Sequence, residues 1–201
     1  SDLSVAHEMR DSREWIAEAK FSPDGKTLAI GSHDNKIYLY DVEKNFILRA
    51  KCESHNSFIT HLDFSEDSEY IQSNCGGFDL MFHKNEDGMV INSPSMLKDI
   101  EWHTFTCTLG WSVQGMWPEV TDQTHYNACD RSNKGGKSIV AAADITGLLH
   151  FFHYPCITKG SPSVKAQAHP GQITNVRFNA NDKFVYTCGG ADRTVCQWKI
   201  T

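Results

Sequence analysis

The sequence has little basic charge, no long apolar run and no C-x-x-C cysteine pair, and each absence excludes a class of protein. Its 19 Lys and Arg residues are outnumbered by 25 Asp and Glu residues, which gives a formal net charge of −6. Binding to nucleic acid or to an anionic membrane requires a concentrated basic surface, so we expect neither partner. No segment approaches the roughly 18 uncharged apolar residues of a membrane helix, and residues 1–11 lack the apolar core of a secretory signal.

The seven cysteines are an odd number and do not form the dense spacing of a secreted disulfide scaffold. Free cysteine is among the most buried residue types. We therefore expect reduced cysteines that pack as small apolar residues, and a cytoplasmic protein.

Catalytic and metal-binding signatures are also missing. The sequence contains no Gly-x-Ser-x-Gly elbow and no phosphate-binding glycine loop. His103 and Cys107 lie four residues apart, but a structural zinc site shows four closely spaced ligands. We expect no enzymatic activity, no metal and no cofactor, and we assign the ten histidines to turns and structural hydrogen bonds.

A repeated pattern is the main positive feature of the sequence. The segments IAEAKF, ITHLDF and ITNVRF begin at Ile16, Ile59 and Ile173, and each carries apolar residues at its first and fourth positions and Phe at its sixth. Each is followed by a turn and two strand-like runs. A period of about 40–45 residues with three visible strands matches a WD-repeat propeller blade. The prediction is an all-β fold, a WD-repeat β-propeller segment of about four blades with approximate bounds 1–44, 45–93, 94–163 (atypical) and 164–201.

The last repeat carries the fullest set of residues that WD blades use for internal hydrogen bonds. In such blades Asp accepts from His, His bonds a Thr hydroxyl, and that hydroxyl accepts from the Trp indole. A buried polar group without its partner costs roughly 1–3 kcal/mol, so the set acts as a unit. We expect Asp192→Ala to lower the melting temperature more than Asp144→Ala, whose repeat has no matching Trp. The set comprises His169, Thr187, Asp192 and Trp198.

Three aromatic residues stand apart from those at fixed core positions of the repeat. Trp15 and Phe58 precede the first strands of two repeats, and Phe78 lies in a turn between second and third strands. In a propeller both places open onto one face, where exposed aromatic residues are favoured binding anchors. The alternative is local packing. The predicted partner-binding residues are Trp15, His33, Asp34, Phe58, Phe78, Asp144, Asp192 and Arg193.

Several segments are more distinctive than WD repeats in general. These are GSHDNKIYLY from Gly31, SFITHLDFS from Ser57, KDIEW from Lys98, GMWP from Gly115 and FHYPC from Phe152. They resemble the second propeller of the echinoderm microtubule-associated-protein-like family, over residues 1–201. The resemblance implies a non-enzymatic cytoskeletal protein that binds tubulin or microtubules. The alternative is a generic WD-repeat scaffold that recruits another protein or a short peptide.

The same resemblance shapes the expected assembly. The family also has a basic coiled-coil region and a first propeller, so we expect this chain to be the C-terminal part of a larger protein. Residues 94–125 are expected to add strand-like segments to the atypical blade. Residues 3–8 are expected to be able to form the outermost strand of a blade. They could complete the last blade within one chain, between two chains that form an eight-bladed ring, or not at all in a fragment of a larger propeller. Because an unclosed ring exposes apolar sheet faces, the isolated chain should form a homodimer unless further blades precede it.

Overall fold

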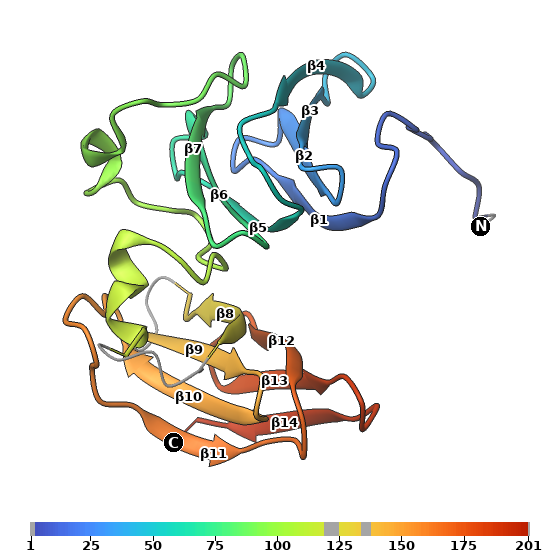
Figure 1. Cartoon of the computed structure of the whole chain (residues 1–201). Coiled ribbons are helices and arrows are strands. Elements are labelled where there is room, and N and C mark those ends of the chain that lie inside the picture. The colour runs from blue at the N-terminus through green and yellow to red at the C-terminus, as the bar shows by residue number, and fades with distance from the viewer. Residues whose placement is uncertain (1–2, 119–124, 134–137, 201) are drawn as a thin grey trace. The chain divides into compact units, whose positions relative to one another are not determined.

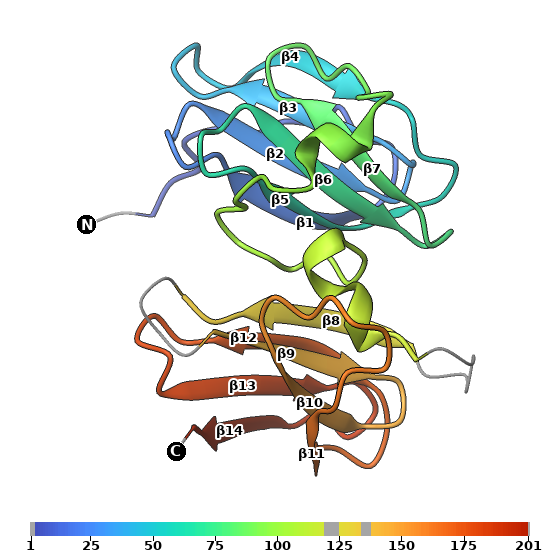
Figure 2. The same ribbon diagram turned by 90° about the vertical axis from the view of Figure 1, so that its left-hand side faces the viewer.

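The computed structural model describes residues 3–118, 125–133 and 138–200. The chain divides into two compact units, residues 1–103 and residues 104–201, and each unit contains two antiparallel sheets (Figures 1 and 2). The architecture is therefore all-β with about four blades, which confirms the predicted fold class. No helix within the described ranges is long and apolar enough to span a bilayer.

The first unit contains one four-stranded and one three-stranded sheet. The sheet of β1–β4 runs in chain order, and so does the sheet of β5–β7. Residues 89–91 run along the free edge of β7 through a bridge between His83 and Val90 and through backbone bonds to Phe82 and Lys84. The strands are β1 (Ile16–Phe21), β2 (Thr27–Ser32), β3 (Ile37–Asp41), β4 (Ile47–Cys52), β5 (Ile59–Phe64), β6 (Tyr70–Cys75) and β7 (Leu80–Lys84).

The second unit repeats this plan. Its sheets have the orders β11-β10-β9-β8 and β12-β13-β14, and the inner strands β8 and β12 lie side by side in both views (Figures 1 and 2). The carboxylate of Asp130 in β8 accepts the backbone N–H of Phe178 in β12 at 2.7 Å, which joins the two sheets. The strands are β8 (Tyr126–Arg131), β9 (Ile139–Asp144), β10 (Leu148–His153), β11 (Val164–Gln167), β12 (Ile173–Phe178), β13 (Phe184–Gly189) and β14 (Val195–Lys199).

Each unit has its core between its two sheets. Side chains of successive strand residues point to opposite faces, so the core takes residues from one face of a strand, as with Ile37 and Leu39 of β3. In the first unit a buried ion pair accompanies the apolar residues, because Lys20 Nζ of β1 lies 2.8 Å from Asp63 of β5. The first core contains Ala29, Ile37, Leu39, Cys52, Ile59, Leu62, Phe64 and Ile71, and the second contains Ala128, Ala141, Ala143, Leu149, Ile173, Val176 and Val185.

The strands and the sequence repeats are offset by one strand. β4 lies within the predicted second repeat but pairs with β3, and β11 lies within the predicted fourth repeat but pairs with β10. Each of these repeats thus begins with the outermost strand of the preceding sheet. The exact limits of the repeats stay a prediction.

Two expectations about local structure were wrong. Between residues 94 and 118 the chain forms two short 3₁₀ helices, η1 (Pro94–Leu97) and η2 (Trp111–Met116), instead of extra strands, and residues 119–124 lie outside the described ranges. Residues 3–8 form no strand. The segment that follows them attaches to the first sheet through side chains: Tyr40 donates to Asp11 at 3.0 Å, and the hydroxyls of Ser12 and Ser32 are 2.6 Å apart.

One predicted core aromatic is exposed. Phe21 and Phe64 occupy the same position of the repeated segment, but Phe64 is buried whereas Phe21 is 56% exposed. Phe21 is the last residue of β1, and it is not among the side chains that pack in the core of its unit.

Candidate functional site

The antiparallel hairpins place two groups of turns at opposite ends of the strands. At one end of the first unit lie the turns 33–36 and 76–79 and the residues that precede β1 and β5. At the other end lie the turns 22–26, 42–46 and 65–69. The predicted partner-binding residues of this unit all belong to the first group, which we call the aromatic end.

Three of these residues form a continuous row of rings. The His33 ring lies 5.7 Å from the Trp15 ring and stacks on the Phe58 ring at 4.8 Å, measured between centroids. The backbone N–H of His33 donates to the carbonyl of Trp15 at 2.8 Å, which fixes one end of the row. The structure therefore brings Trp15, His33 and Phe58 together, and we call them the aromatic row.

Gly76 supports the other end of the aromatic row. Its N–H donates to the carbonyl of Phe58 at 2.8 Å, and the tip of the Phe58 ring lies against its α-carbon. A β-carbon at Gly76 would be only 2.3 Å from Phe58 Cζ, so only glycine leaves room for the ring. The sequence alone did not indicate this contact, which becomes visible only when Phe58 is placed.

The aromatic side chains of this end remain accessible to solvent. Trp15 is 77% exposed, Phe58 is 41% exposed and Phe78 is 60% exposed. Phe78 also has a φ of 61°, in the left-handed region that a bulky residue rarely adopts. Asn35, in the corresponding turn of the first sheet, has a φ of 69°, and Asn tolerates this region much better. Residues held in such conformations cluster at functional sites.

Two carboxylates lie in the turns of the aromatic end. Asp34 follows His33 directly and accepts the Tyr38 hydroxyl at 2.6 Å. Partial burial opposes its ionisation, but the hydrogen bonds from Tyr38 and Ser32 outweigh this effect and hold the pKa of Asp34 below its ordinary value. In the turn that begins at Gly76, Asp79 is half-buried, with Oδ2 3.7 Å from the Cys75 sulfur. Both acidic groups thus belong to turns of the aromatic end.

In the second unit, Asp192 takes part in the hydrogen-bond set of its blade. His169 Nδ1 lies 2.7 Å from Asp192, His169 Nε2 lies 2.9 Å from the Thr187 hydroxyl, and Trp198 donates to that hydroxyl at 3.1 Å. The bond to His169 holds the pKa of Asp192 below its ordinary value. Gly189 leaves space for this pair, because a β-carbon there would be 1.9 Å from the Asp192 carboxylate. The neighbouring Arg193 is exposed, with a φ of 56°.

Asp144 differs from the other predicted contact residues because it is only 2% exposed. It accepts hydrogen bonds from the backbone N–H groups of Thr146 and Leu148, both at 2.8 Å, and from the Thr146 hydroxyl, and it lies 3.0 Å from His150 Nε2. Burial opposes ionisation, but these bonds together lower the pKa of Asp144. Its carboxylate is therefore used within its own blade.

Ser163 extends this group, since its hydroxyl lies 3.4 Å from His150 Nδ1. The contacts run from a hydroxyl (Ser163) to a histidine (His150) to a carboxylate (Asp144), as in the catalytic triad of a hydrolase. A hydroxyl, a histidine and an aspartate also recur in the last blade, as Thr187, His169 and Asp192. The two groups occupy different positions, since His150 lies on β10 and His169 precedes β12, but each gives a buried histidine hydrogen-bond partners, as buried polar groups require.

The second sheet has an incomplete version of the same set. His55 Nε2 lies 2.7 Å from the Ser73 hydroxyl, but His83 occupies the position of the Trp and has no hydrogen-bond partner for either ring nitrogen among the described residues. His83 is fully buried. Burial, assisted by the nearby His55, lowers the pKa of His83 to about 4.

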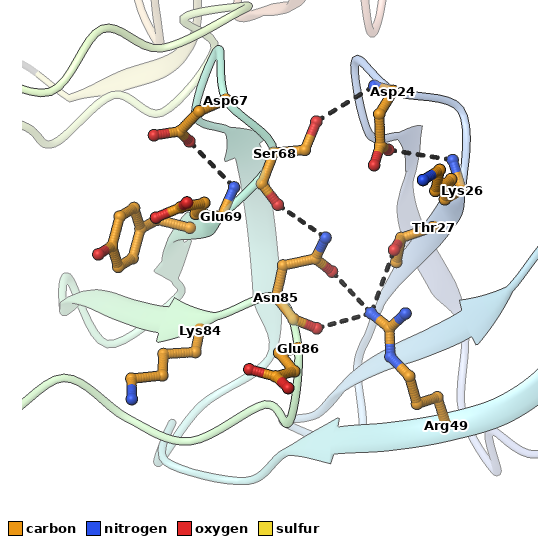
Figure 3. Close-up of a pocket in the computed structure, with 11 residues that line it drawn as sticks. Asp24, Lys26, Thr27, Arg49, Asp67, Ser68, Glu69, Lys84, Asn85 and Glu86 are labelled. Atoms are coloured by element: carbon orange, nitrogen blue, oxygen red, sulfur yellow. Dashed lines mark hydrogen bonds between the residues drawn. The ribbon is translucent and has the colours of Figure 1, made fainter.

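A polar cavity of about 540 Å³ lies at the opposite end of the first unit, between its two sheets (Figure 3). Arg49 of β4 forms its main cross-link, donating through Nη2 to Thr27 Oγ1 at 3.1 Å and to the carbonyl and side-chain oxygens of Asn85 at 2.6 and 2.9 Å. Sequence reasoning did not single out Arg49. Residues of both charges line the cavity, including Asp24, Lys26, Asp67, Glu69, Lys84 and Glu86.

The described residues contain no group of three or more His, Cys, Asp or Glu side chains placed to hold a metal ion. All seven cysteines are free, five of them buried and two half-buried. Burial raises the pKa of the Cys52 thiol to about 12, which keeps it protonated and unreactive.

Comparison with known proteins gives a consistent family relationship. A family model described as the second beta-propeller of echinoderm microtubule-associated protein matches residues 1–200. The chain is 42% identical over 203 residues to echinoderm microtubule-associated protein-like 4 of Mus musculus, and 39% identical over 202 residues to echinoderm microtubule-associated protein-like 1 of Homo sapiens. Each alignment covers 99% of this chain but only 20% and 24% of those relatives.

Solved structures support the fold alone. The beta-propeller domain of Myceliophteria thermophila Cps50 (Swd1) superposes with a TM-score of 0.68 at 16% identity, covering 98% of this chain and 68% of that one. The computationally designed Ika4 protein gives a TM-score of 0.50 at 18% identity, covering 96% of both chains.

Proposed function

The chain belongs to the echinoderm microtubule-associated-protein-like family, and from this premise we propose that it is a non-enzymatic protein-interaction module that binds tubulin or microtubules through its aromatic end. The names of its relatives associate them with microtubules. The chain spans 20–30% of the relatives it matches, so the binding is proposed for this portion and not taken over from the whole proteins. We place the protein at the cytoplasmic cytoskeleton.

The observation that carries this proposal is the exposed aromatic row. Trp15 and Phe58 present large apolar surfaces at turns that two sheets hold in fixed positions. Aromatic residues of this kind dominate the binding energy of protein interfaces when a partner covers them. Asp192 and Arg193, in the turn between β13 and β14 of the second unit, are proposed as further contact residues.

The proposed mechanism is rigid display without chemistry. Strand pairing and the blade hydrogen bonds fix the turns, so little conformational entropy is lost when a partner binds. Asp144 contributes indirectly, since its four hydrogen bonds shape the turn between β9 and β10. We also propose that the four sheets are consecutive blades of one propeller portion.

Microtubule co-sedimentation of the 201-residue chain tests the proposal. The double variant Trp15→Ala, Phe58→Ala should weaken binding by at least about tenfold, the factor expected when two interface aromatics are truncated. Phe21→Ala is the matched control, because Phe21 is also exposed but lies at the opposite end of β1. Undiminished binding of the double variant would exclude the aromatic end. No binding by the unaltered chain would favour a scaffold for another protein or peptide.

A further inference from the structure

We propose that the aromatic row is a receptor for an arginine side chain of the partner protein. This inference rests on the proposed function in one respect: both assign binding to the aromatic end of the first unit. It adds the chemistry of recognition, which is stacking of a guanidinium group on the aromatic rings with charge supplied by Asp34 and Asp79.

The arrangement of the rings suits a flat cation. Trp15 is held through its backbone carbonyl by His33, and its side chain is 77% exposed, so a ring face remains available to a partner. Phe58 continues the row through the stacked His33 ring. Guanidinium groups stack on aromatic faces and are more weakly hydrated than ammonium groups, which makes arginine the favoured cation at such surfaces.

The carboxylates at the aromatic end favour a cation over an anion. Lys36, in the same turn as His33, pairs with Glu53 at 2.5 Å. Arg13 is exposed two residues before Trp15, and its backbone N–H lies 3.4 Å from the Asp34 carboxylate. Asp34 and Asp79 form no ion pair among the described residues. Asp34 also stays ionised, because hydrogen bonds overcome its partial burial.

The charge of the whole unit acts in the same direction. Residues 1–103 contain 10 Lys and Arg against 19 Asp and Glu, whereas the remaining residues contain 9 against 6. The negative charge of the chain is therefore concentrated in the unit that carries the aromatic row. A field of this sign increases the association rate of a cationic partner and makes that rate sensitive to salt.

Phe78 provides an independent indication that this end is shaped for a ligand. A phenylalanine at a φ of 61° destabilises its turn, and its side chain is 60% exposed. Because Phe78 lies in the turn between Gly76 and Asp79, it adds exposed aromatic surface to the same end of the unit.

Short peptides test the inference without tubulin. The probe is acetyl-Gly-Arg-Gly-Arg-Gly-amide. One control peptide carries citrulline in place of arginine, which keeps a planar side-chain group but removes its charge. The other carries lysine, which keeps the positive charge but has no planar group. Titration is followed by Trp fluorescence and by amide chemical shifts. We expect saturable shifts near Trp15 and Gly76, binding of the lysine peptide weaker by about threefold or more, and no saturable binding of the citrulline peptide.

Two glycine variants provide a matched pair. Gly76→Ala should displace the Phe58 ring and weaken arginine-peptide binding by at least about threefold. Gly77→Ala should bind normally, because the nearest atom to a β-carbon there is 3.4 Å away. Asp34→Asn with Asp79→Asn should reduce binding and its salt dependence while the near-ultraviolet circular dichroism stays unchanged.

The outcomes separate this inference from the proposed function. Equal binding of the arginine and citrulline peptides, or full binding by Gly76→Ala, would overturn the arginine receptor even if microtubules bind. Selective arginine binding that Gly76→Ala removes would support it even if the chain fails to co-sediment with microtubules.

Discussion

Replacing His83 with leucine should make the protein more stable, and the gain should grow as the pH falls. His83 is fully buried in the first unit, and neither of its ring nitrogens has a hydrogen-bond partner among the described residues. An unsatisfied buried polar group costs about 1–3 kcal/mol. Leucine has a similar volume and no polar atom, so we expect His83→Leu to gain about 1 kcal/mol or more at neutral pH.

The pH dependence follows from the lowered pKa of His83, which is about 4 instead of the ordinary 6.5. Between these values the unfolded chain binds a proton that the folded chain rejects, so stability falls as the pH decreases from 6.5 to 4. One pKa unit corresponds to 1.36 kcal/mol, so His83 alone should cost about 2 kcal/mol at pH 5 and about 3 kcal/mol below pH 4. The leucine variant lacks this loss.

Urea unfolding followed by Trp fluorescence at pH 7.5, 6 and 5 measures both effects. The free energy of unfolding of His83→Leu should exceed that of the unaltered protein at every pH, with the widest difference at pH 5. His103→Leu is the control, because His103 is half-exposed and contacts Glu66. Parallel curves for His83→Leu and the unaltered protein would refute the argument, since they would show that His83 does not resist protonation in the folded state.

Three further predictions concern other positions. Asp144→Ala should lower the melting temperature more than Asp192→Ala, because Asp144 is 2% exposed and accepts several hydrogen bonds. This is the reverse of the expectation from the sequence. Calorimetry of both variants tests it, and a larger decrease for Asp192→Ala would support the expectation from the sequence instead. Phe78→Asn should raise the melting temperature, because Asn relieves about 1 kcal/mol of left-handed backbone strain. The same variant should weaken arginine-peptide binding. A lower melting temperature would show that Phe78 stabilises its turn. Light scattering should show a homodimer of the isolated chain, because large apolar side chains such as Phe21, Ile47 and Val195 are exposed; a monomer at high concentration would contradict this.

The residues at repeated positions carried most of what could be predicted about the fold. The pattern shared by the segments at Ile16, Ile59 and Ile173 places three inner strands where the structure has β1, β5 and β12. Strand alternation and turn residues are local properties, so a single sequence reveals them. The order of His169, Thr187, Asp192 and Trp198 matched a known blade pattern, and their hydrogen bonds are present.

The candidate site was predictable only in part. The positions of Trp15 and Phe58 before two inner strands indicated a shared end of the sheets, and the structure joins their rings through His33. The contact of Phe58 with Gly76 could not be read from the sequence. It depends on the rotamer of one ring and on the distance between two turns.

The predictions that were wrong or missing concern contacts between residues that are distant in the sequence. The strand propensity of residues 3–8 does not show whether the edge of a sheet is free to pair with them, and they form no strand. The following segment instead contacts the first sheet through the side chains of Asp11 and Ser12. Asp144 is an ordinary turn aspartate by sequence, but the register of β9 and β10 brings His150 to it and buries both. His83 replaces a Trp without a new partner for its nitrogens, and only packing shows this. Local periodicity therefore determined the strands and turns of this protein, whereas burial and side-chain pairing were decided by tertiary structure, because they depend on neighbours distant in the chain.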